Sequence, residues 1–137
     1  MTRDEHGQAS ALLLGVLLLG LLFVGFAVDG ARLFTARRDL QNVADSAALA
    51  GASEIDASVY RASGGADVRL DPHGARVAVD EIVRASSLPA DTTVDVQVAA
   101  DRVVVRIARP VHLQFLGLAG LGPQQIGAHA SAAPQTG

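Results

Sequence analysis

The sequence predicts an α+β fold: one long N-terminal helix, then a small domain with one helix and an antiparallel sheet of three or four strands. Three observations predict it. Residues 11–28 form an uncharged apolar run, residues 33–50 carry an apolar stripe at helical spacing, and residues 93–107 alternate apolar and polar side chains. The 137 residues suffice for one small domain and an anchor. We therefore divide the chain into a short leader (1–8), a transmembrane helix (9–28), an amphipathic helix (29–53) and a small domain (54–137).

The apolar run, ALLLGVLLLGLLFVGFAV, is long enough to cross a bilayer. At about 1.5 Å per residue it spans about 27 Å, close to the roughly 30 Å of membrane hydrocarbon. Two alternatives stay open: a core helix of a soluble protein, and a signal peptide cleaved after Gly25-Phe26-Ala27. The domain is too small to enclose an apolar helix of this length, which argues against a core helix. The run also exceeds the usual signal-peptide core of about 7–15 residues, which argues against a cleaved signal peptide. We therefore predict a single-pass anchor in a lipid bilayer.

Charged residues return directly after the run. Asp29 and Arg32 are three residues apart on the predicted helix, and we expect them to form an ion pair at the membrane edge. The arginines also bear on orientation, because basic residues favour the cytoplasmic side. Arg3 alone precedes the run, whereas Arg37 and Arg38 join Arg32 after it. Taken alone, this distribution places the C-terminal domain in the cytoplasm.

The helix is expected to continue out of the membrane to about Gly51. Apolar residues recur there at spacings of three and four, which is the signature of one apolar helical face. This stripe is predicted to pack either on the chain's own sheet or on neighbouring helices in an assembly. As an interface its candidate residues are Leu33, Ala36, Leu40, Val43 and Ala47.

A second helix and a hairpin follow. Asp71 offers an N-cap, and the proline after it suits a first helical position, so we expect a helix from there to about Ser87. Two alternating runs, 93–98 and 102–107, indicate half-buried strands. A hairpin that turns through residues 100–101 pairs Val96 with Val105 and Asp95 with Arg106, so apolar and charged pairings agree on one register.

The last part of the chain is predicted to complete the sheet. Pro110 is expected to interrupt the ladder, after which residues 111–115 resume an alternation and residues 125–132 return as a strand. Between them lies an apolar segment, 116–122, that is too short to span a bilayer. It is either a tucked-in loop or a hydrophobic contact surface for a partner or for the membrane. Its candidate contact residues are Phe115, Leu116, Leu118 and Leu121.

No catalytic constellation is found in the sequence. Cysteine is absent, and the four histidines, at 6, 73, 112 and 129, show no metal-ligand spacing. The glycines at 117, 120 and 122 lack the Gly-Lys-Ser/Thr of a phosphate loop. The basic residues are eleven scattered arginines within a net charge of −3, which does not favour nucleic-acid binding. We expect no enzyme, no cofactor, no metal and no nucleic-acid partner.

The segment directly after the apolar run, VDGARLFTARRDLQNVADSAALAGA (28–52), resembles the TadE/TadG-like proteins of Flp (tight adherence) pilus assembly. The resemblance covers roughly Gly7 to Ala52, with a looser echo at 115–117 and 126–132. It implies a bacterial inner-membrane protein that is pilin-like or pseudopilin-like and works with a secretion-type assembly machine. The N-terminus would be cytoplasmic and the small domain extracytoplasmic, against the arginine distribution, and we follow the resemblance.

The resemblance also implies partners and a processing site. The partners would be other pilus-assembly or pilin-like membrane proteins, or a second copy of the chain. A prepilin-type site would be cleaved between Gly7 and Gln8, although the acid usual five residues into the mature chain is replaced by Leu12. The alternative function is a membrane-tethered extracytoplasmic binding module that has no part in pili.

Overall fold

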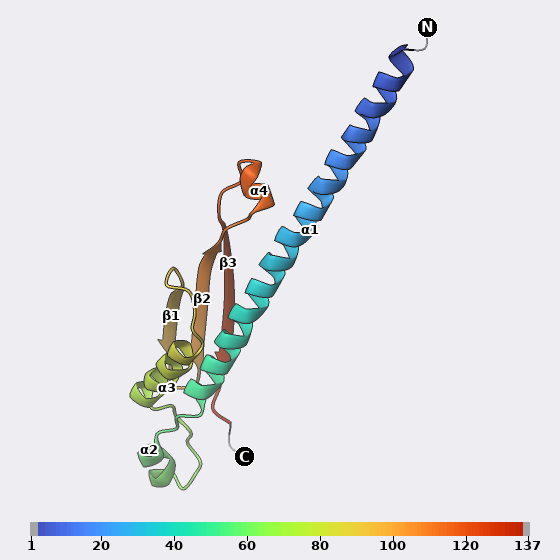
Figure 1. Cartoon of the computed structure of the whole chain (residues 1–137). Coiled ribbons are helices and arrows are strands. Elements are labelled where there is room, and N and C mark those ends of the chain that lie inside the picture. Colours follow the sequence, from blue (N-terminus) through green and yellow to red (C-terminus); the bar gives the residue numbers. More distant parts are fainter. Residues whose placement is uncertain (1–2, 136–137) are drawn as a thin grey trace.

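The computed structural model describes the backbone of residues 3–135 and the side chains of residues 8–135. Its elements follow the predicted order, with the small domain at the C-terminal half of one long helix (Figure 1). They are α1 (Arg3–Ala52), α2 (Ala57–Ala62), α3 (Pro72–Ala85), β1 (Thr93–Val98), β2 (Val103–Val111), α4 (Phe115–Leu118) and β3 (Gln124–Ala132). The predicted α+β class is confirmed.

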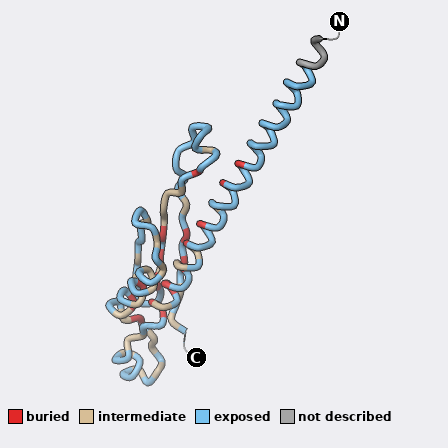
Figure 2. Tube along the Cα trace, viewed as in Figure 1, coloured by how far each residue is buried: buried red, intermediate tan, exposed pale blue. Residues whose placement is uncertain are grey.

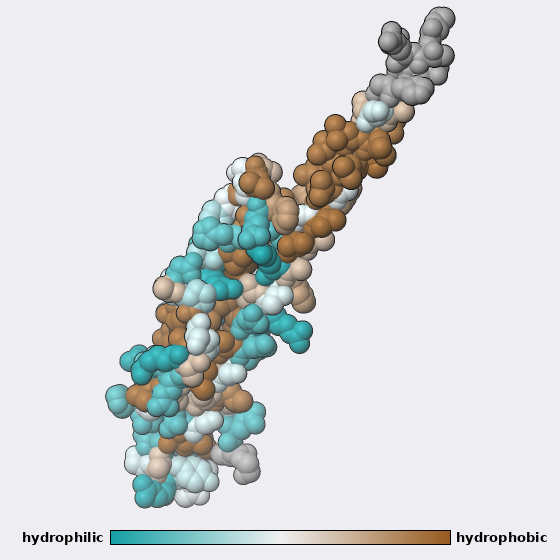
Figure 3. Space-filling model, viewed as in Figure 1, coloured by the Kyte–Doolittle hydropathy of each residue, from teal (hydrophilic) through white to brown (hydrophobic). Residues whose placement is uncertain are grey.

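Helix α1 is one unbroken rod of 50 residues, about 75 Å long at the usual helical rise. It already begins at Arg3, inside the predicted leader. Most of its N-terminal half stands free of the domain, and large apolar side chains from Leu12 to Phe26 are 54–71% exposed there (Figure 2). Within the described residues, α1 is the one helix long and apolar enough to cross a membrane. Its free half forms the apolar end of the molecule (Figure 3).

The sheet has three antiparallel strands in the order β1-β2-β3. Val96 pairs with Val105 and Asp95 with Arg106, as the sequence predicts. The Arg106 Nη1 donates to the Asp95 carboxylate at 3.2 Å, and the Ala99 N–H closes the two-residue turn with a 2.9 Å bond to the Arg102 carbonyl.

Pro110 does not interrupt the ladder, so that prediction is wrong. It lies inside β2 opposite Gln125, and the pairing of β2 with β3 continues to Val111. The reason lies on the other side of β2: β1 begins at Thr93, opposite Ala108, so from Arg109 onward β2 has only one neighbouring strand. A residue without an N–H is tolerated at such a half-unpaired position.

The core lies between one face of the sheet and the two helices α1 and α3. The stripe of α1 packs into this core, where Ala36, Leu40 and Ala47 are at most 6% exposed, Leu33 is half-buried and Val43 packs at the margin. The stripe residues therefore pack against the chain's own domain, and their role as an interface between subunits stays a prediction. The alternative, that the stripe receives the chain's own sheet, is confirmed.

Among the described residues, the small domain has three helices rather than one. α3 starts at Pro72 after the N-cap Asp71, whose carboxylate accepts from the His73 N–H at 3.0 Å, and it ends two residues before the predicted Ser87. The six-residue α2 and the four-residue α4 were not predicted, because neither is long enough to show a helical period.

Candidate functional site

The most unusual side chain of the structure is the carboxylate of Asp29 on α1. It is 0% exposed, the one fully buried charged side chain among the described residues. Its oxygens accept hydrogen bonds from three successive backbone N–H groups, those of Gln114 at 3.0 Å, Phe115 at 2.9 Å and Leu116 at 2.8 Å. These amides open α4, where the first N–H groups of a helix have no partner within the helix. Asp29 therefore caps α4 from another element, far away in the sequence.

One helical turn before Asp29, α1 lets α4 approach closely. Gly25 is buried, and an added Cβ there would lie 2.8 Å from both the Cβ and Cγ of Phe115. Residues four apart share a helix face, so Gly25 and Asp29 meet α4 on the same side of α1. We call the Asp29 carboxylate, the amides of 114–116 and the Gly25–Phe115 contact the Asp29 junction.

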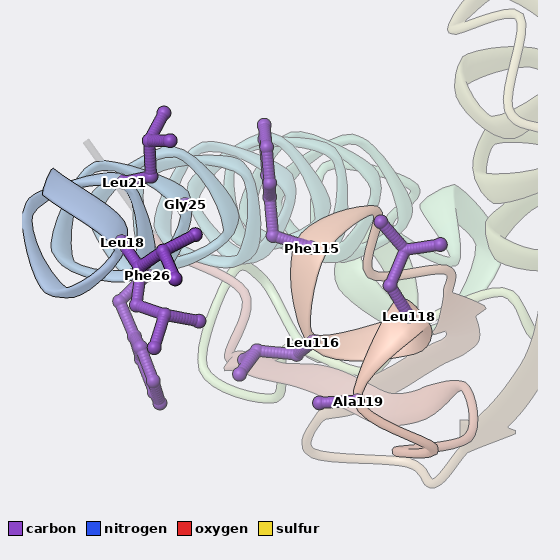
Figure 4. A pocket seen from close by; sticks show the side chains of 9 residues that line it. Leu18, Leu21, Gly25, Phe26, Phe115, Leu116, Leu118 and Ala119 are labelled. Carbon is purple, nitrogen blue, oxygen red and sulfur yellow. The ribbon is translucent and has the colours of Figure 1, made fainter. Parts of the chain in front are cut away.

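Beside the junction, α4 and the free half of α1 enclose an apolar groove of about 500 Å³. Figure 4 shows Leu116 pointing from α4 toward the side of α1 that carries Leu18 and Phe26. The groove is lined by Leu18, Leu21, Leu22, Gly25, Phe26, Phe115, Leu116, Leu118 and Ala119. No lining residue carries a charge or a polar side chain, so the groove suits an apolar occupant and offers no group for acid–base chemistry.

The predicted ion pair of Asp29 and Arg32 is not found among the described residues. Arg32 is exposed, and the Asp29 oxygens face the three amides of α4 instead. The physical reason is that buried N–H groups need an acceptor, whereas an exposed guanidinium is solvated by water. The hydrogen-bond partners of the Asp29 carboxylate are thus the three amides of α4.

The other predicted site residues fall into two groups. Gly7 and Gln8 lie within the continuous helix α1. The candidate contact residues of the 116–122 segment lie at the end of the domain nearest the free half of α1 (Figure 1). Leu118 is 88% exposed, Leu121 50% and Phe115 45%, and Leu116 is half-buried. The segment is thus a surface turn rather than a tucked-in loop.

Sequence reasoning missed Gly25 and the three amides. The available signal was an acidic residue immediately after a long apolar run, together with a conspicuous apolar segment elsewhere. Among the described residues, no group of three or more histidine, aspartate or glutamate side chains is placed to hold a metal ion.

The long helix decides what the chain resembles. Residues 7–54 match the family model described as "Putative Flp pilus-assembly TadE/G-like". This TadE/G-like segment comprises nearly all of α1 and the first residues after it, which confirms the resemblance seen in the sequence. Comparison with curated proteins and with solved structures finds no match. The TadE/G-like segment points to involvement in Flp pilus assembly as a structural component, and with the apolar helix it indicates anchoring in a membrane.

Proposed function

We propose that the chain is a pilin-like or pseudopilin-like component of Flp (Tad) pilus assembly, or of a related secretion apparatus, that acts through subunit contacts. One observation carries the proposal: the TadE/G-like segment is itself the rod, with a free apolar half and a half packed on the chain's own α+β domain. A free helix that is apolar all round needs lipid or other helices around it.

The rod would sit in a bacterial inner membrane with its N-terminus in the cytoplasm and its domain outside. The chain has no cysteine, so single cysteines can report this orientation. With a membrane-impermeant maleimide on spheroplasts, Val77→Cys on the exposed side of α3 should be labelled at once. Glu5→Cys in the leader should be labelled only after lysis. The reverse pattern would overturn the orientation.

We place the subunit contacts outside the stripe, because the stripe packs in the chain's own core. The exposed surface of α1 beyond the apolar run carries two large apolar residues, Phe34 at 71% exposure and Leu49 at 63%. They are the contacts we propose, with other pilus-assembly membrane proteins or with a second copy of the chain.

Photo-crosslinking tests this contact directly. A photoreactive amino acid at Phe34 or at Leu49 of the full chain, expressed in its own cells, should crosslink to a pilus-assembly protein or to another copy. Val77, 45% exposed on α3, is the matched control position and should not. Cells that carry Phe34→Glu should also lose their surface pili. The variant itself should stay folded, because the Phe34 side chain is exposed. Normal piliation without position-specific crosslinks would contradict the proposal and favour a tethered binding module.

A further inference from the structure

The apolar turn of α4 stands beside the membrane-spanning part of α1 rather than beside its water-exposed part. Phe115 contacts Gly25, and the groove between the two elements reaches Leu18. Both positions lie inside the apolar run that ends at Val28. Gly25 lies three residues before that end, so Phe115 sits about 5 Å inside it along the helix axis. A bilayer that covers the run therefore also reaches α4.

The bilayer cannot be shifted to leave α4 in water. Lifting α4 clear of the hydrocarbon would move the membrane edge back toward Leu18, and only about 15 Å of apolar helix would remain from Ala9. Membrane hydrocarbon is roughly 30 Å thick, so half of it would then face charged or polar residues of the leader. The length of the run fixes α4 at the edge of the hydrocarbon.

The side chains and the backbone of the turn both suit lipid. From Phe115 to Gly122 no side chain is charged or polar, and Leu118 is 88% exposed within the protein. Backbone N–H groups in hydrocarbon need internal acceptors. The Asp29 carboxylate is the acceptor for the N–H groups of residues 114–116. The Leu121 N–H donates to the Leu116 carbonyl and the Gly120 N–H to the Gly117 carbonyl, each at 3.0 Å.

We propose that residues 115–121 form a second membrane contact, a turn that inserts into the leaflet on the domain side of the bilayer, with lipid acyl chains filling the groove between α4 and α1. The carboxylate of Asp29 makes this insertion feasible, because it satisfies the amides that lipid cannot. The turn and the Asp29 junction fix the tilt and rotation of the domain against the membrane surface, since two points of attachment replace one flexible stalk. This inference rests on the membrane anchor of the proposed function, and not on a role in pili.

Tryptophan fluorescence can test it, because the chain has no tryptophan of its own. Leu118→Trp places one reporter on α4, Leu17→Trp one in the anchor and Val77→Trp one on the water-exposed side of α3; all three positions are exposed within the protein. Each full-length variant is inserted, one chain per disc, into nanodiscs with or without lipids brominated along the acyl chains. One chain per disc removes any second copy that might cover α4.

We expect the brominated lipids to quench most of the emission at positions 17 and 118 and none at position 77, with blue-shifted emission at 118. Quenching at 17 without quenching at 118 would overturn the inserted turn and leave the anchor standing, as expected if α4 binds another protein. Absence of quenching at both positions would overturn the anchor and the inserted turn together. Either failure is independent of the crosslinking and piliation results that test the pilus role.

Discussion

Phe115 and Gly25 touch so closely that a single methyl group on the glycine would lie 2.8 Å from the phenylalanine Cβ. A Cβ atom cannot turn away as the end of a flexible side chain can, so the backbone of α4 would have to move. This contact packs α4, near the C-terminus, against the apolar run near the N-terminus. Asp29 lies four residues after Gly25 on α1 and accepts hydrogen bonds from the N–H groups of Phe115 and Leu116 of the same α4. The junction thereby links the anchor to the domain.

Gly25→Ala is predicted to loosen α4. Alanine alone stabilises a helix by about 0.8–1 kcal/mol relative to glycine, so a variant without the contact would gain stability. We expect the opposite at this position: faster amide hydrogen exchange at residues 114–116, and a lower unfolding temperature of the domain in detergent micelles.

Gly20→Ala is the matched control, because nothing lies within 4 Å of a Cβ at Gly20. It should leave exchange at 114–116 unchanged. Equal behaviour of the two variants would show that the close approach of Phe115 does not constrain α4.

Asp29→Ala is predicted to release α4 more completely. It removes the acceptor of three N–H groups, so amide hydrogen exchange at residues 114–116 should be faster than in Gly25→Ala. Asp29→Asn should fall between the unaltered protein and Asp29→Ala, because an amide keeps one carbonyl oxygen but places an N–H₂ where the second acceptor stood. Amide hydrogen exchange at residues 114–116, followed by mass spectrometry on the full chain, compares the unaltered protein with Asp29→Ala and Asp29→Asn.

Asp39→Asn on the exposed side of α1 removes a negative charge but leaves the Asp29 cap of α4 in place. Unchanged exchange at 114–116 in this control would exclude a general effect of charge on α1. Unchanged exchange in Asp29→Ala would instead show that these amides stay protected without the carboxylate.

Most of the fold follows from local patterns in the sequence. The apolar run, the stripe, the N-cap at Asp71 and the hairpin register of residues 93–107 each depend on residues close together in the chain, and the structure confirms them. Pro110 was misjudged because its tolerance depends on where a neighbouring strand ends. The extent of the neighbouring strand is a property of the tertiary structure, and the local sequence around Pro110 does not predict it.

The junction could not be predicted for the same reason. Asp29 and Leu116 are 87 residues apart, and no pattern in the sequence of either segment predicts that the two are in contact. Arg32 was the nearer choice on the helix, and sequence spacing favours such local pairs. Likewise the stripe of α1 fits a neighbouring subunit as well as the chain's own sheet, and only the packing decides between them.

Leu40→Ala is predicted to destabilise the domain strongly. Leu40 is 1% exposed in the core, and a buried leucine truncated to alanine costs about 2–5 kcal/mol because a cavity replaces it. Leu49→Ala on the same helix, where the side chain is 63% exposed, should cost far less. Thermal unfolding followed by circular dichroism in micelles compares the two. A small loss in Leu40→Ala would argue that the stripe faces another subunit and not the sheet.

Gly51→Ala is predicted to push α1 away from α3. An added Cβ would lie 2.9 Å from Val79 Cγ2, 3.2 Å from the Ala75 carbonyl oxygen and 3.3 Å from Val103 Cγ1, so it meets both the helix and the sheet. We expect a loss of about 1–3 kcal/mol, the usual cost of overpacking a core. Val79→Ala removes the nearest of these atoms, so the double variant should lose less than the sum of the two single losses. Strict additivity in denaturant unfolding would show that the two residues do not meet, and that α1 and α3 cross elsewhere.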